Sequence, residues 1–306
     1  MGMTGVLLAP ETASVLRKYL TDAGDGGARI VESVGRISGP DGRPHEYEGI
    51  ALAVSRAAAS SVHAASSTVN HRVLAIAALL LRPQPRVSAL KLPDSIVPFF
   101  HLEIKKISEH ILRDDPRAYP SDTDDAFIKD ARFATGYSIP CGAQSVEMDD
   151  QVRLRSLLKH FLLARDPRPL MRLGTKALDA MWFGIHTDSR DVSEFNERGW
   201  VACYRRIGEL LERHPSVAGV VGTSWFFDPQ VLKVSPRLGY LQRLPLENGA
   251  IAIRNGPGAV HTERATATSE TRRRLFEQGN YTPVCFTIAW PRTAILEWCD
   301  KGDAPT

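Results

Sequence analysis

The chain has 306 residues, of which 43% are hydrophobic and 24% charged, the balance of an ordinary globular protein. Its net charge of +3 and its scattered basic residues give no case for a nucleic-acid partner. Four cysteines without a CxxC pair exclude a disulfide framework and a zinc knuckle. The longest apolar run, residues 73–81, is too short for a membrane span, and no signal-peptide pattern precedes it. We therefore expect a cytoplasmic protein with no membrane partner.

The first 150 residues predict a mostly helical part. Helical spacing of apolar residues predicts helices over residues 11–20 and 99–112, and Pro10 opens the first of them. The Ala-rich residues 57–81 predict a third helix. Two strand-like pieces, residues 29–37 and 47–54, flank a turn-rich Gly-Pro-Asp-Gly segment. The polar residues 114–125 predict a surface loop or lid.

The pattern of apolar and polar residues changes after residue 150. Helices are predicted over residues 151–163 and 191–213, and a strand over residues 178–185. Short apolar runs then alternate with turn residues, which predicts strands over residues 217–227, 231–242, 249–254, 258–263 and 281–290. Such intervals are typical of a β-sandwich or barrel. We expect one domain over residues 1–306, with a helical part (1–150) packed on a β-rich core (151–306).

The motif with the clearest chemistry is His186-Thr187-Asp188, which follows the apolar strand. A histidine and a carboxylate two positions apart on an extended strand point to the same face, so both can reach one ion. A distant second histidine would complete a triad that leaves metal positions open for substrate and oxygen. His261, 75 residues after His186, is preferred to His214, which looks like the polar end of a helix before a proline.

Arginines follow at a suggestive distance: Arg272 and Arg274 lie 11 and 13 residues after His261. A guanidinium pairs well with the far carboxylate of a dicarboxylate cosubstrate. This order of residues resembles the Fe(II)/2-oxoglutarate-dependent oxygenase superfamily, and the stretch from His261 to Arg274 resembles its phytanoyl-CoA dioxygenase-like branch. The resemblance covers residues 178–290.

The resemblance implies an α+β fold with a double-stranded β-helix (jelly-roll) core on which the helical N-terminal part packs. It implies Fe(II) held by His186, Asp188 and His261, and 2-oxoglutarate held by Arg272 or Arg274, a choice that stays open. Molecular oxygen would be the second partner, and a small amino-acid-like or natural-product substrate would be oxidised at an unactivated C–H bond.

Two other functions stay open. The same ligands could hold zinc for a hydrolytic reaction, which would leave the arginines unexplained. The chain could also be a non-catalytic jelly-roll binding protein. Weaker candidates are Asp228, as a turn cap or an acceptor beside a ligand histidine, and Asn248, Arg254 and Arg264, as partners of a substrate carboxylate.

Overall fold

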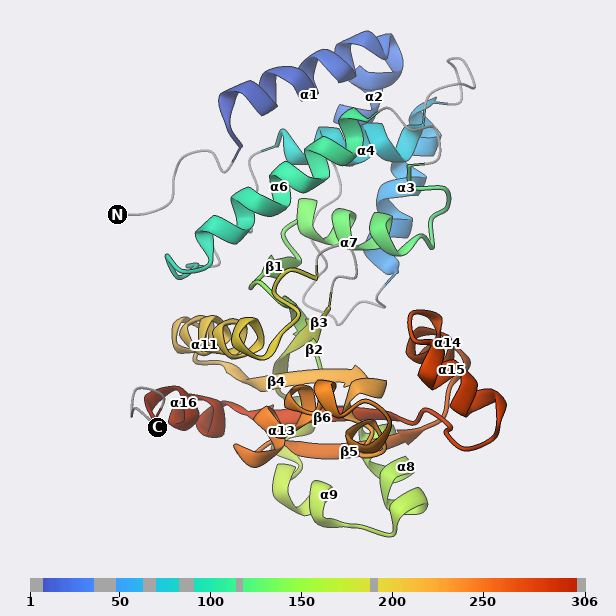
Figure 1. The fold of residues 1–306 in the computed structure, drawn as a ribbon. Coiled ribbons are helices and arrows are strands. Elements are labelled where there is room, and N and C mark those ends of the chain that lie inside the picture. Colours follow the sequence, from blue (N-terminus) through green and yellow to red (C-terminus); the bar gives the residue numbers. More distant parts are fainter. Residues whose placement is uncertain are drawn as a thin grey trace. The chain divides into compact units, whose positions relative to one another are not determined.

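The computed structural model describes residues 8–35, 48–62, 70–82, 91–113, 118–187 and 192–301. The chain divides into two compact units, Met1–Pro140 and Cys141–Thr306 (Figure 1). Among the described helices, none combines the length and apolar composition that a membrane crossing requires.

The first unit is built from helices around one buried helix. Its elements are α1 (Pro10–Asp22), α2 (Gly24–Gly35), α3 (Gly49–Val62), α4 (His71–Leu80), α6 (Val97–Leu112), α7 (Asp125–Ala134) and the short strand β1 (Ser138–Pro140). Helix α4 is apolar on all sides, and all of its residues from Val73 to Leu80 are buried. A helix of that kind needs neighbours all round, and α1, α2, α3, α6 and α7 contact it.

The helices predicted at residues 11–20 and 99–112 are confirmed as α1 and α6. The strands predicted at residues 29–37 and 47–54 are wrong, because the described parts of both belong to α2 and α3. Their β-branched residues favoured a strand, but the buried positions Ile30 and Val34, and then Ile50, Val54 and Ala58, recur every fourth residue. The predicted helix over residues 57–81 is divided between α3 and α4, and residues 63–69 lie outside the described part.

The second unit is built on a mixed sheet. Its strands are β2 (Ser145–Asp150), β3 (Met181–His186), β4 (Val217–Ser224), β5 (Ile251–Gly256) and β6 (Cys285–Pro291). In space they follow the order β2-β3-β4-β6-β5. Only β3 and β4 pair in parallel; the other neighbours in this order are antiparallel. The parallel pair needs a crossover, which α11 (Glu197–Arg213) supplies.

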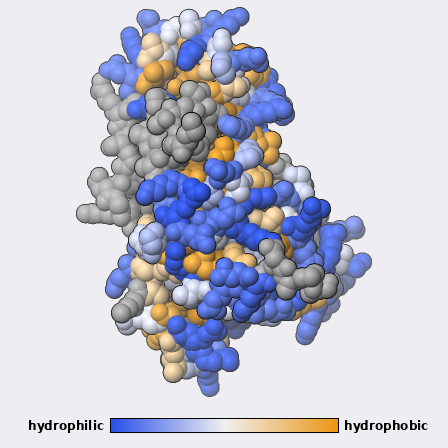
Figure 2. All heavy atoms as spheres, turned by 90° about the vertical axis from the view of Figure 1, so that its left-hand side faces the viewer, coloured by the Kyte–Doolittle hydropathy of each residue, from blue (hydrophilic) through white to orange (hydrophobic). Residues whose placement is uncertain are grey.

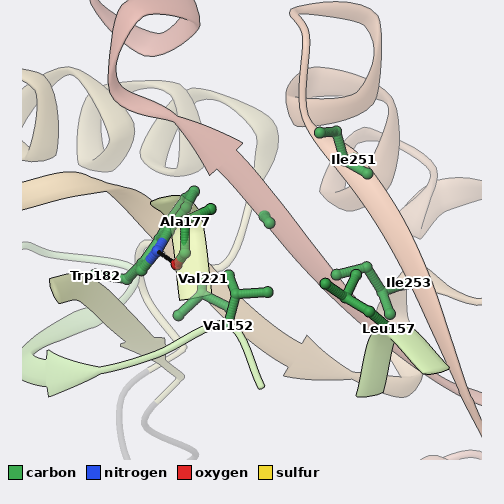
Figure 3. Close-up of a cluster of buried hydrophobic side chains, with 8 residues drawn as sticks. Val152, Leu157, Ala177, Trp182, Val221, Ile251 and Ile253 are labelled. Atoms are coloured by element: carbon green, nitrogen blue, oxygen red, sulfur yellow. Dashed lines mark hydrogen bonds between the residues drawn. The ribbon is translucent and has the colours of Figure 1, made fainter. Parts of the chain in front are cut away.

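Helices cover both faces of this sheet (Figure 1). On one face, Trp290 of β6 packs edge-on against Tyr204 of α11, and α16 (Arg292–Asp300) lies beside α11. The other face carries α8 (Leu154–Ala164), α9 (Arg168–Leu173) and α10 (Lys176–Asp179). There a buried apolar cluster forms, with the Trp182 indole N–H donating to the Ala177 carbonyl at 2.9 Å (Figure 3). The cluster consists of Val152, Leu157, Ala177, Trp182, Val221, Ile251, Ile253 and Ala289.

The remaining elements of this unit are short helices. They are η1 (Trp225–Phe227), α12 (Val231–Val234), η2 (Pro236–Leu238), α13 (Tyr240–Glu247), α14 (Ala259–Ala267) and α15 (Glu270–Glu277).

The predicted jelly roll is wrong, because the described strands of the second unit form one mixed sheet with helices on both faces. Residues 231–242 and 258–263, predicted as strands, belong to α12, η2, α13 and α14. Short apolar runs do not by themselves distinguish a strand from a short buried helix. The strands predicted near β3, β4, β5 and β6 and the helix near α8 are confirmed, and α11 begins at Glu197 with Asn196 as its N-cap.

Candidate active site

The candidate site lies on β2 and β3, where an irregular pairing brings acidic side chains together. Glu147 pairs with Gly184, but the register then shifts, and Asp150 pairs with Trp182. One extra residue in β2 is a β-bulge, which re-aims the side chains that follow it. A Cβ atom on Gly184 would lie 2.7 Å from an Asp150 carboxylate oxygen. Asp150 and Glu147 therefore lie on the same face of the sheet, where the Asp150 carboxylate covers Gly184.

His186, the last residue of β3, completes this group. Its Nε2 lies 3.1 Å from Oε2 of Glu147. The Glu147 side chain is 9% exposed and the His186 side chain 32% exposed. A buried carboxylate behind a reachable imidazole orients the ring. This is the arrangement that a proton acceptor for an incoming nucleophile requires.

Asp150 adds a second carboxyl group to the same face. Burial raises the pKa of Asp150, a hydrogen bond from the backbone N–H of Gln151 and the charge of His186 lower it, and the charge of Glu147 raises it again. The net direction is upward. The site thus holds two carboxyl groups in unequal environments, one against the imidazole and one over Gly184.

The site lies where the parallel strands end their pairing. The paired register of β3 and β4 stops at Gly184 and Val221, although β3 continues to His186 and β4 to Ser224. Over these last residues β3 stays paired with β2 and β4 with β6. The mutual pairing of the two parallel strands therefore ends before the strands do, near the carboxyl ends where open sheets bind their ligands, although the Ile185 side chain still lies against Gly222. We name residues 185–187 and 222–224 the open strand ends.

The structure describes two of the three residues that the sequence grouped as metal ligands. His186 contacts Glu147, and Asp188 lies outside the described residues. His261 lies in the first turn of α14, on a helix and not on a strand. Burial, followed by the charge of Arg264, lowers the pKa of His261. In the part of the chain that the structure describes, no three His, Cys, Asp or Glu side chains are grouped to hold a metal ion.

The two arginines predicted to bind 2-oxoglutarate have different surroundings. Arg272 is buried, and its guanidinium donates to the Ala265 carbonyl at 2.5 Å and to the Ser235 hydroxyl at 3.0 Å. It also lies 4.6 Å from the centre of the Trp225 ring. Arg274 is exposed on α15. The contacts of Arg272 are those of a side chain that holds η1, α14 and α15 together.

The weaker candidates also have local partners. Asp228 is buried and accepts the backbone N–H groups of Gln230 and Val284, each at 3.0 Å, which confirms its turn-capping role. The Asn248 side chain donates to the Leu244 carbonyl at 2.8 Å. Arg264 is exposed on α14.

Sequence reasoning missed Glu147 and Asp150. A signal was present, because polar and apolar residues alternate along Ser145-Val-Glu-Met-Asp149, the pattern of a half-buried strand. That pattern places Glu147 on one face. It does not predict the bulge, which moves Asp150 onto the same face.

Comparisons with known proteins give a partial likeness of fold. No protein-family model matches the chain, and no curated protein matches it. A solved acyltransferase in complex with decanoyl-CoA is similar at 13% identity over 92% of this chain and 79% of that chain, with a TM-score of 0.46. An acyltransferase in complex with decanoyl-CoA and teicoplanin is similar at 14% identity over 93% of this chain and 81% of that chain, with a TM-score of 0.48. Likenesses of this size assign no activity to the chain.

The prediction of an Fe(II)/2-oxoglutarate-dependent oxygenase of the phytanoyl-CoA dioxygenase-like branch is wrong. The jelly roll that the resemblance implied is replaced by the mixed sheet, and the described residues hold no group of three His, Cys, Asp or Glu side chains that could bind iron. The predicted iron, 2-oxoglutarate and oxygen lose their basis with it. His-x-Asp spacing and a later His and Arg constrain no distance between segments that fold onto different elements, so the roles predicted for these individual residues stay predictions.

Proposed function

We propose that this chain is an acyltransferase that moves an acyl group from a thioester donor of the acyl-CoA type to an amine or hydroxyl. One observation carries the proposal: the pairing of β3 and β4 ends at Gly184 and Val221, beside the contact between Glu147 and His186. A binding place for an extended donor and a proton acceptor for a nucleophile thus lie at the same strand ends.

The donor is inferred from the backbone. Beyond Gly184 and Val221, β3 and β4 are no longer paired with each other, and N–H and C=O groups on such strand edges pair with extended chains that carry amides. The pantetheine arm of an acyl-CoA is an extended chain with amide groups and ends in the thioester. In this arrangement the arm lies between β3 and β4, and the acyl carbonyl lies near the end of β3.

The chemical step follows from the acid–base pair. The acceptor nitrogen or oxygen attacks the thioester carbonyl, the new N–C or O–C bond forms, and the C–S bond breaks. The proton of the nucleophile passes to the Glu147–His186 pair, and that pair returns it to the leaving thiolate, so a free thiol is produced. General-base catalysis of this kind contributes about 10²- to 10⁴-fold in rate.

The test is acyl transfer itself. Purified protein is incubated with acyl-CoA donors of increasing chain length and a library of small amines and alcohols, and acylated products are measured by mass spectrometry. We expect product with wild type and a loss of about 10²-fold or more with Glu147→Gln. Arg274→Gln, an exposed change on α15, is the matched control and keeps wild-type activity. Equal rates for wild type and Glu147→Gln, or no product from any donor, would refute the proposal.

A further inference from the structure

Helix α8 has an apolar stripe on its outer side as well as on its inner side. Leu157 and His160 are buried against the sheet. Leu154, Leu158, Phe161 and Leu162 are exposed, at positions i, i+4, i+7 and i+8 of the same helix. Leu162 and Met171 of α9 are each 76% exposed. We name this the α8–α9 surface, formed by Leu154, Leu158, Phe161, Leu162, Leu163 and Met171.

The same segment concentrates positive charge. Residues 153–172 contain six basic side chains and one acidic side chain, an excess of five positive charges, whereas the whole chain has a net charge of +3. The basic residues are Arg153, Arg155, Lys159, Arg165, Arg168 and Arg172, all of them exposed. The single acid, Asp166, is bound by Arg168 through two hydrogen bonds of 2.8 Å. The segment therefore presents cations next to apolar side chains.

We propose that the α8–α9 surface docks on an anionic lipid bilayer. Basic amphipathic helices lie in the plane of such a surface, with apolar side chains at the boundary of headgroups and acyl chains and cations against the headgroups. Figure 2 shows hydrophobic beside hydrophilic surface at the lowest end of the second unit, where Figure 1 places α8 and α9. This is peripheral binding, which does not require a helix that crosses the membrane.

Two other binding partners would match fewer side chains of the α8–α9 surface. A second copy of the chain, placed by a two-fold axis on the same patch, would bring two sets of like charges together. A nucleic acid would pair with the arginines, but it would leave Leu158, Leu162 and Met171 without apolar partners. A bilayer with acidic headgroups satisfies the cations and the apolar side chains together.

The experiment is co-sedimentation of the full chain with vesicles of phosphatidylcholine alone and of phosphatidylcholine mixed with phosphatidylglycerol. We expect binding to the mixed vesicles that weakens with added salt, and weak binding to the neutral vesicles. The double variant Arg155→Gln/Arg165→Gln lowers the partition coefficient about 30-fold, because each cation near the surface contributes about fivefold. Leu162→Gln/Met171→Gln lowers it about tenfold or more.

Matched controls lie on α14 and α15. Val260→Gln removes another exposed apolar side chain, 55% exposed, and Arg274→Gln removes another exposed cation; both keep wild-type binding. Equal binding to neutral and mixed vesicles, or wild-type binding by both double variants, overturns the proposal. A self-association that only the α8–α9 variants abolish, seen by sedimentation velocity without vesicles, overturns it in favour of a second copy. The readout is independent of acyl transfer, so either proposal can fail alone.

Discussion

The end of β3 and the first turn of α15 each carry a basic side chain that the sequence analysis selected, His186 and Arg272. The two side chains differ in their partners and in their exposure. Arg272 is buried, and its donors are taken by a backbone carbonyl and a hydroxyl under an aromatic ring. His186 is about one-third exposed and contacts a buried carboxylate at strand ends beyond the paired register of β3 and β4. A polar group bound to fixed structural partners stabilises a fold, whereas a reachable titratable pair can exchange protons. The difference in partners and exposure, not the residue type, indicates which place does chemistry.

The largest effect on activity is expected from a substitution at the end of β3. With acyl transfer as the readout, His186→Ala lowers kcat/KM by about 10²- to 10⁴-fold, because it removes the group that takes the proton. The thermal midpoint stays within a few degrees of wild type, since the side chain is partly exposed. A drop in activity that follows only a loss of folded protein would contradict this assignment.

The opposite outcome is expected at α15. Arg272→Ala removes two hydrogen bonds and the contact with Trp225 and leaves the Ser235 hydroxyl without its donor. We expect a loss of about 2–4 kcal/mol in the free energy of unfolding, measured by urea denaturation, with unchanged kcat/KM per folded molecule. Exposed Arg274→Ala changes the free energy of unfolding by less than about 0.5 kcal/mol. Loss of activity in fully folded Arg272→Ala would show that Arg272 acts in the site and not only in stabilising the fold.

The close approach of the Asp150 carboxylate to Gly184 is tested by adding a methyl group to the glycine. In Gly184→Ala the new Cβ meets the Asp150 carboxylate at 2.7 Å, so we expect a loss of about 1–3 kcal/mol in the free energy of unfolding. Removing the obstacle should offset this loss, so Gly184→Ala/Asp150→Ala is more stable than the sum of the two single variants requires. Strict additivity in this double-mutant cycle would show that Asp150 does not cover Gly184.

The smallest effect is expected from Asp150 and depends on pH. Its carboxyl has a raised pKa in the folded protein, so the folded state holds this proton more tightly than the unfolded state. Ionisation therefore costs stability as pH rises through the folded pKa, and the cost is absent below the unfolded value near 3.8. Asp150→Asn should be more stable than wild type at neutral pH, with a difference that shrinks toward acid in urea titrations. A stability difference that grows toward acid would mean that folding lowers, and does not raise, the pKa of Asp150.

The sequence predicted local structure well where periodicity was strong. The helices α1, α6 and α8 and the strands β3, β4 and β6 follow from the spacing of their apolar residues. Residues 231–242 form short helices and not the predicted strand, and Pro236 opens one of them, η2. Counting such apolar runs as strands favoured a β-sandwich or barrel, and the family resemblance then implied the jelly roll.

The candidate site was only half accessible to sequence reasoning. His186 was found because it ends an apolar strand, although for a different chemistry. Glu147 was not, because its contact with His186 depends on the antiparallel register of β2 and β3, and register is set by the folded sheet. Arg272 shows the reverse case, in which correct spacing suggested a role that burial and local partners explain otherwise. The functional roles predicted for Asp188 and His261 stay predictions.

The most direct measurement is a map of backbone amide signals, by TROSY nuclear magnetic resonance, as CoA is added to the full chain. The account predicts that the largest changes occur at the open strand ends, residues 185–187 and 222–224, and that they persist in Glu147→Gln, which retains the backbone. Changes confined to other elements, such as α14 and α15, or no change at saturating CoA, would contradict it.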